Sequence, residues 1–212
     1  MRELPALPAM DLAAYLCSRV CHDVISPVGA IANGIELLDE GSDDDTAEIA
    51  MDLIRSSAKN ASARLQYARI AFGAAGSAGA NIDTGDAEAV SRAFFDNEKK
   101  TELEWSGERA LLAKDKVKLL LNLLLVGLGA IPRGGIVKVE IDDPNGDVSF
   151  KITATGPKGR VPPVFLDLLN GSFEESVDAH SIQPIYTLQL ANSSGLEVSA
   201  SLQGEDVVFT AS

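Results

Sequence analysis

The chain has 212 residues, of which 46% are hydrophobic and 23% are charged, an ordinary balance for a soluble globular protein. Its formal net charge of -13 argues against nucleic acid and anionic membranes as direct partners and would suit a partner with a basic face. The longest apolar run, 119–132, contains Asn122 and is too short to span a bilayer, and the start of the chain has no apolar signal core. We therefore expect a cytoplasmic protein that does not bind membranes.

A first long helix is predicted from about residue 10 to residue 40, where Gly41 is typical of a helix C-terminus. Its apolar residues gather on one stripe at helical spacing: Leu12, Ala13, Leu16, Val20, Val24, Ile31, Ile35 and Leu38. Pro27 lies in its interior and should bend the axis.

His22 falls almost opposite this stripe, on the same side as Ser18, Ser26 and Gly29. A helix normally fills its outer face with long polar side chains, so small residues around one imidazole indicate a surface that another protein approaches closely. The alternative is an incidental surface histidine.

The only two cysteines, Cys17 and Cys21, lie one helical turn apart on the same helix. A disulfide within one helix is geometrically poor, so we expect both thiols to be reduced. A metal site with His22 would lack a fourth ligand, because the only other histidine, His180, lies far away in the sequence. We therefore expect no bound metal.

A second helix is predicted over about 47–72, after a loop whose acidic residues suit a helix N-terminus. Two long helices joined by a short loop make an antiparallel hairpin. Pairing two hairpins about a two-fold axis would bury both apolar stripes, so we expect a homodimer held by a four-helix bundle. The Gly- and Ala-rich segment 73–80 reads as a linker and divides the chain into domains at 1–75 and 81–212.

The second half mixes helical and strand patterns and predicts a two-layer α+β domain, with helices on one face of a mostly antiparallel sheet. The predicted helices span 86–97, 114–131, 163–169 and 182–191. The predicted strands span 102–105, 136–141, 148–153, 196–202 and 207–210. We expect Phe94, Phe95 and Trp105 to be core or domain-packing residues and His180 to be an ordinary surface residue.

This layout resembles the core of a sensor histidine kinase, and so does the segment His22-Asp23-Val24-Ile25-Ser26-Pro27-Val28. The phosphoacceptor motif of that family reads His-Glu/Asp-Leu-Arg-Thr/Asn-Pro-Leu, and His, acid and Pro are in register here. The resemblance implies that His22 accepts the phosphoryl group and that Asp23 is the general base or orienting carboxylate. Ile25 and Ser26 depart from the family pattern, and Ser26 stands at a position that the family links to phosphatase chemistry.

The second half resembles the kinase ATP-binding (Bergerat) domain, but its nucleotide motifs are degenerate. The asparagine box reads Asn122-Leu123-Leu124-Leu125-Val126-Gly127, so that Val126 replaces the asparagine that holds Mg²⁺ in the family. Only Gly156 remains of the adenine-reading motif, and 182–186 occupies the region of the glycine-rich phosphate loop. A site without these groups should not hold nucleotide, so we expect no cofactor on this chain.

A kinase-like chain that keeps its histidine and lacks its ATP site resembles the ChpT class of alphaproteobacterial histidine phosphotransferases. This resemblance implies a relay from the receiver domain of a CckA-like hybrid histidine kinase through His22 to CtrA-like and CpdR-like response regulators. Mg²⁺ would be supplied by the partner receiver domain. The receiver would dock on Ser18, Arg19, His22, Ser26, Gly29 and Asn33, with the second half adding a further contact surface.

Two alternatives remain open. One is a divergent ATP-dependent histidine kinase, which ATP binding measured by calorimetry would support. The other is a catalytically silent dimeric scaffold, whose output would survive the substitution His22→Ala.

Overall fold

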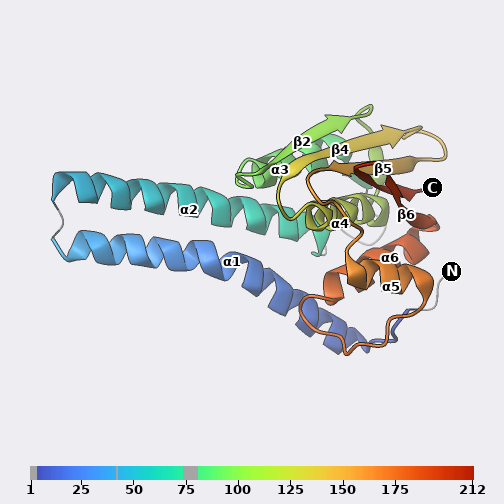
Figure 1. Ribbon diagram of the computed structural model, residues 1–212, viewed down its shortest axis with the longest axis horizontal. Helices are drawn as coiled ribbons and strands as arrows, with labels where there is room; N and C mark the ends of the chain where they lie inside the picture. Colours follow the sequence, from blue (N-terminus) through green and yellow to red (C-terminus); the bar gives the residue numbers. More distant parts are fainter. Residues whose placement is uncertain (1–3, 42, 74–80) are drawn as a thin grey trace.

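The computed structural model describes residues 4–41, 43–73 and 81–212. Its first two elements, α1 (Ala9–Asp39) and α2 (Asp44–Ala71), form an antiparallel hairpin that projects as a long arm (Figure 1). The side chain of Asp43 caps α2 by accepting a hydrogen bond from the backbone N–H of Thr46, at 2.9 Å. Gly41, with φ of 79°, takes the left-handed conformation that commonly ends a helix. The predicted hairpin is confirmed.

The contact between α1 and α2 rests on small residues. Pro27 and Gly34 are the buried residues of α1. A Cβ atom added to Gly34 would lie 2.6 Å from Cγ1 of Ile54, so only glycine allows the two backbones to approach this closely. The N-terminal part of α1 is inclined to the rest of the helix (Figure 1), as the interior Pro27 predicts.

Several large apolar side chains of the hairpin stay exposed within one chain. Ile25 is 71% exposed, Ile49 is 69% exposed, and Val28, Ile35 and Leu65 are each between 46% and 49% exposed. Only Ile35 of these residues belongs to the apolar stripe predicted for α1, and together they form an apolar surface along the arm.

The second half is a two-layer α+β unit, as predicted. Its helices and strands are β1 (Asn81–Asp83), α3 (Thr84–Phe95), β2 (Thr101–Ser106), β3 (Leu111–Ala113), α4 (Lys114–Ala130), β4 (Gly135–Asp142), β5 (Ser149–Thr155), α5 (Pro163–Asn170), α6 (Ile182–Ser194), β6 (Val198–Gln203) and β7 (Asp206–Ala211). The main sheet has the order β2-β4-β5-β7-β6, in which β2 is parallel to β4 and every other pair is antiparallel. The helices lie together on one side of this sheet (Figure 1).

The core of the second half lies between the sheet and α4. On β4, Val137, Val139 and Ile141 are buried and alternate with partly exposed residues, which gives the sheet one apolar face. Helix α4 is buried nearly all round, as its mostly apolar sequence from Leu119 onward predicts. Phe94 and Phe95 are buried, and Trp105 packs against the same core, so their prediction as packing residues is confirmed.

Two short strands were not predicted from the sequence. Strands β1 and β3 pair with each other over Asn81–Asp83 and Leu111–Ala113 to form a small separate sheet. Three residues are too few to show the alternation by which a strand is recognised.

The end of α2 belongs to the core of the second half. Tyr67, Ile70 and Ala71 are buried in the same cluster as α4, and the Tyr67 hydroxyl donates to the carbonyl of Leu121 at 2.6 Å. The predicted linker, 73–80, lies outside the described residues except for Gly73, so the domain limits 1–75 and 81–212 stay a prediction. In the ranges that the structure describes, no helix is both long enough and apolar enough to cross a membrane.

Candidate functional site

His22 stands on the outer surface of α1 beside Asp23. Its side chain is 63% exposed, and its Nδ1 lies 3.4 Å from Oδ1 of Asp23. The other carboxylate oxygen of Asp23, Oδ2, accepts a hydrogen bond from Nε of Arg19 one turn earlier, at 2.9 Å. Asp23 is thus oriented by Arg19 and turns its remaining oxygen toward the imidazole.

This arrangement favours one tautomer of His22. A carboxylate beside Nδ1 holds the ring proton there, which leaves the lone pair on Nε2. Because most of the side chain is exposed, the ring is accessible to a group presented by another molecule. The residues can therefore offer an exposed ring whose Nδ1 faces a carboxylate and whose other nitrogen can act as a nucleophile.

A groove of about 360 Å³ runs beside His22 between the two helices of the hairpin. Its walls are His22, Asp23, Ser26, Pro27 and Ala30 from α1 and Ser57, Asn60 and Arg64 from α2. Its polar α2 side was missed by the sequence analysis. Asn60 and Arg64 are spaced by one helical turn, and this spacing was the available signal.

Arg64 is held firmly at this groove. Its Nε donates to Oδ1 of Asn60 at 2.9 Å, and its Nη2 donates to Oε1 of Glu98 at 2.7 Å. Its guanidinium also lies over the ring of Phe94, 5.1 Å from the centroid. Arg64 therefore links the hairpin to the second half next to His22.

The predicted docking residues lie on one helix, as expected. Ser18, Ser26, Gly29 and Asn33 are exposed, and Arg19 is half-buried by its pairing with Asp23. A Cβ atom built on Gly29 would have nothing within 4 Å, so this part of the surface is open. The face is low and accessible, and its use as a docking surface stays a prediction.

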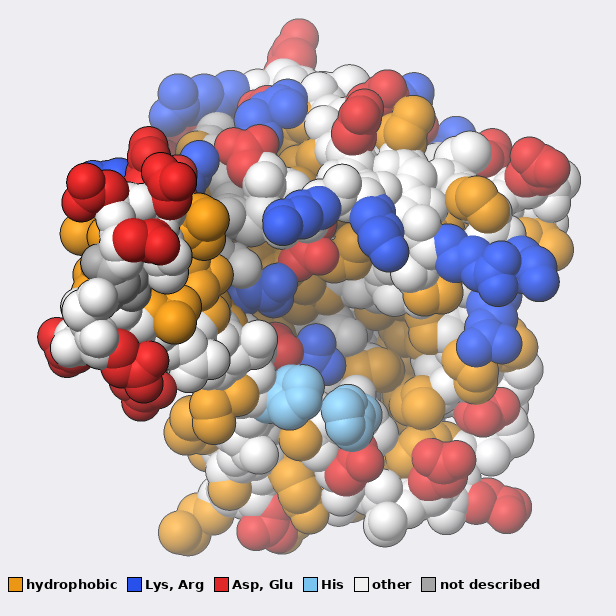
Figure 2. Space-filling model, turned by 60° about the vertical axis from the view of Figure 1, so that its left-hand side comes forward, with side chains coloured by type: hydrophobic (Ala, Val, Ile, Leu, Met, Phe, Trp, Pro, Cys, Tyr) orange, Lys and Arg blue, Asp and Glu red, His pale blue; other side chains and the backbone are white. Residues whose placement is uncertain are grey.

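His180 was predicted to be an ordinary surface residue, and this is wrong in one respect. It is exposed, but its ring packs against that of His22, with centroids 5.5 Å apart and an interplanar angle of 77°. Figure 2 shows the chain's two histidines side by side at the edge of a hollow in this face. Among the described residues, no group of three or more His, Cys, Asp or Glu could hold a metal ion. Cys17 and Cys21 are free and exposed.

The segment that resembles the asparagine box is part of the core. Asn122 is fully buried, and its Nδ2 donates to the carbonyls of Ala71 and Lys118 at 3.0 and 2.9 Å. Its backbone carbonyl and its Oδ1 both accept from Nε2 of Gln183 in α6, at 2.9 and 3.3 Å. Asn122 thus joins the end of α2, α4 and α6.

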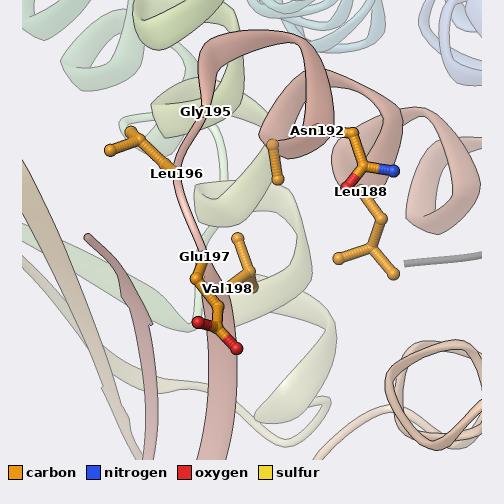
Figure 3. A pocket seen from close by; sticks show the side chains of 7 residues that line it. Leu188, Asn192, Gly195, Leu196, Glu197 and Val198 are labelled. Atoms are coloured by element: carbon orange, nitrogen blue, oxygen red, sulfur yellow. The ribbon is translucent and has the colours of Figure 1, made fainter. Parts of the chain in front are cut away.

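A second cavity, of about 420 Å³, lies between the end of α6 and the start of β6 (Figure 3). Leu188 and Asn192 face it from α6, and Glu197 and Val198 border it on the other side. Glu197 is the only ionisable side chain among the described residues that line this cavity. The cavity lies at the C-terminal end of α6, about 20 Å along the helix from the end next to His180. It therefore has no part in the chemistry of His22.

Comparisons with known proteins give concordant matches. The family model of the histidine phosphotransferase C-terminal domain matches residues 84–206. Protein phosphotransferase ChpT of Brucella abortus (strain 2308) is 60% identical over 206 residues, which cover 97% of each chain. A bacterial phosphotransferase solved at 1.7 Å superposes with a TM-score of 0.92 and 57% identity, covering 99% of this chain and 100% of the other.

Proposed function

Because this chain belongs to the histidine phosphotransferase family, we propose that it passes phosphoryl groups through His22 in a multistep phosphorelay. The observation that carries this proposal is the accessible imidazole of His22, whose Nδ1 faces an oriented carboxylate on Asp23. The ring also borders the groove between the two helices of the hairpin.

The proposed reaction needs little from the chain beyond position and charge. Nε2 of His22 attacks the phosphorus of an aspartyl phosphate on a receiver domain, an N–P bond forms, and the P–O bond to the aspartyl carboxylate breaks. The Asp23 carboxylate holds the proton on Nδ1 of His22 and stabilises the positive charge that develops on the ring. The reverse transfer onto the aspartate of a second receiver regenerates neutral His22. Mg²⁺ belongs to the receiver in this proposal.

The second half is proposed to act without nucleotide. Val126 is buried where the kinase family has its Mg²⁺-binding asparagine, and the side chain of Asn122 is engaged in the core. Residues 182–185, in the region of the phosphate loop, form the buried first turn of α6. These features support a relay protein over a divergent ATP-dependent kinase.

We further propose a homodimer through the hairpin. The exposed apolar side chains of α1 and α2, Ile25 and Ile49 foremost, would be covered by a second copy in a four-helix bundle. This leaves His22 on the side of the hairpin that faces the second half of its own chain.

The proposed partners are receiver domains. By resemblance to the ChpT class, the donor is the receiver of a CckA-like hybrid histidine kinase and the acceptors are CtrA-like and CpdR-like response regulators. The docking face would be formed by Ser18, Arg19, Ser26, Gly29 and Asn33 around His22. The net charge of -13 would favour a receiver that presents a basic rim.

The test offers two phosphoryl donors, ATP and a phosphorylated receiver domain, to the wild type, to His22→Ala and to the control Cys21→Ser. Cys21 is the exposed neighbour of His22 on the same helix, so its substitution controls for local disturbance of α1. We expect labelling of the wild type and of Cys21→Ser from the receiver alone, and none of His22→Ala. Labelling from ATP would instead identify a working kinase.

Absence of labelling from either donor, across a panel of receivers, would favour the silent scaffold. In that case a receiver should still bind His22→Ala as tightly as the wild type, which calorimetry measures.

A further inference from the structure

His22 is held only loosely by its own helix. Its contact with Asp23 is long for a hydrogen bond, 3.4 Å between Nδ1 and Oδ1, and its side chain is 63% exposed. With this contact alone, an exposed histidine would sample several rotamers. The ring of His180 supplies a second contact, edge to face at 5.5 Å between centroids.

His180 itself is set in a turn that Asp178 organises. Oδ1 of Asp178 accepts the backbone N–H groups of His180 and Ser181 at 2.9 and 2.8 Å, and the Ser181 hydroxyl at 3.0 Å. The Ser181 N–H, with its hydroxyl and the nearby His180, lowers the pKa of the Asp178 carboxyl below its ordinary value. The carboxylate is therefore charged at neutral pH, and its three hydrogen bonds stabilise the turn.

This turn is anchored to the rest of the chain through α6. Ser181 and the following residues Ile182, Gln183 and Ile185 are buried. Gln183 bonds Asn122, which in turn bonds the last residue of α2. The second imidazole is thus tied by buried hydrogen bonds to the same hairpin that carries the first.

We propose that His180 is a positioning residue for phosphoryl transfer at His22. Its ring restricts the His22 imidazole to the rotamer in which Nδ1 faces Asp23, and this leaves Nε2 presented to the incoming phosphorus. His180 exchanges no proton and forms no bond to phosphorus in this scheme, so the balance of the transfer step is unchanged. The role as a positioning residue rests on the proposed function, whereas the restriction of the ring does not.

The kinetic test compares His180→Ala with His180→Phe, which keeps an aromatic ring and removes the titratable nitrogens. Transfer from a phosphorylated receiver is measured by rapid quench over a range of receiver concentrations. The edge-to-face contact predicts that His180→Ala lowers the rate constant at saturating receiver about threefold to tenfold. The half-saturating concentration should be unchanged, and His180→Phe should restore most of the rate.

Two further variants separate positioning from general damage. Asp178→Ala frees the turn without touching either ring, and it should slow transfer in the same direction as His180→Ala. Glu175→Ala changes an exposed acid of the same loop outside the ring contact, and it should leave the rate unchanged. Equal rates for the wild type and His180→Ala at saturating receiver would overturn the proposed positioning role.

A spectroscopic readout tests the ring contact without any transfer. The chain has two histidines, so its imidazole nitrogen spectrum contains only two ring systems. We expect the His22 signals of the wild type to show a single tautomer protonated on Nδ1, and those of His180→Ala to move toward tautomer averaging. Unchanged His22 signals in His180→Ala would overturn the inference. If the His22 signals change in His180→Ala but no receiver labels the wild type, the ring contact is supported and the proposed relay function is contradicted.

Discussion

Replacing Asn122 by leucine tests whether its buried amide holds α2, α4 and α6 together. Leucine has a similar size, so the change removes three hydrogen bonds and leaves no large cavity. The Lys118 carbonyl lies within α4, and Gln183 keeps its bonds to the Asn122 backbone carbonyl and to Thr187. The loss therefore falls on the bond to the carbonyl of Ala71, a fully buried residue.

Depriving a buried carbonyl of its donor costs about 1–3 kcal/mol of unfolding free energy, so we expect about 2 kcal/mol here. For a chain of this length that corresponds to a fall in Tm of about 4–8 °C. The measurement is thermal unfolding by calorimetry at a fixed protein concentration, since dimer stability depends on concentration.

Asn97→Leu is the matched control for this prediction. Its Nδ2 also donates to a carbonyl four residues earlier, that of Ala93 at 2.8 Å, but it is only partly buried and its bond stays within one segment. It should lower Tm much less than Asn122→Leu. Equal shifts in the two variants would refute the idea that Asn122 clasps α2 to α4 and α6.

Three further predictions concern the hairpin. Gly34→Leu should lower the Tm and the helical circular dichroism signal, because a Cβ atom alone would lie 2.6 Å from Cγ1 of Ile54; an unchanged Tm would show that the helices can part without loss. The hydrogen bonds of Thr46 lower the pKa of Asp43, so the stabilisation by this carboxylate is present above the ordinary pKa of 3.8 and is lost at lower pH. Urea unfolding from pH 6 to pH 3 should show a smaller loss of unfolding free energy for Asp43→Ala than for the wild type. Parallel curves for the two proteins would contradict this. Burial raises the pKa of Tyr67 well above its ordinary value of 10.0, so above pH 10 only the unfolded state ionises and the free energy of unfolding should fall by up to about 1.4 kcal/mol per pH unit. Tyr67→Phe should reduce this slope. An identical slope in the variant would disprove the prediction.

The local elements of this fold could be read from the sequence because they are long and periodic. Helices α1, α2 and α4 and the strand pair β4–β5 follow from unbroken helical or alternating patterns. The family motif placed His22 beside Asp23 on an exposed helix face, and their side chains do lie together.

What escaped prediction depends on packing between distant segments. A stripe of aliphatic residues shows which side of α1 is apolar, but it does not tell whether α2 or a second copy covers it; within the chain, the closest approach uses Gly34. The contact of His180 with His22 joins residues far apart in the sequence and follows from the placement of α6. Arg64 was overlooked because its partners, Glu98 and Phe94, lie on the far side of the predicted linker.

The shared core at the end of α2 means that the region matched by the family model and the packed core have different boundaries in this chain. The region that marks the family spans 84–206, yet its central helix α4 is sealed by Tyr67, Ile70 and Ala71 from the preceding hairpin. A gene fusion or truncation placed at residue 81 would keep the whole sheet and uncover the part of α4 that contains Leu121 and Asn122. The second half is thus poorly suited to transfer as a separate module, because part of its core is supplied by the end of the hairpin.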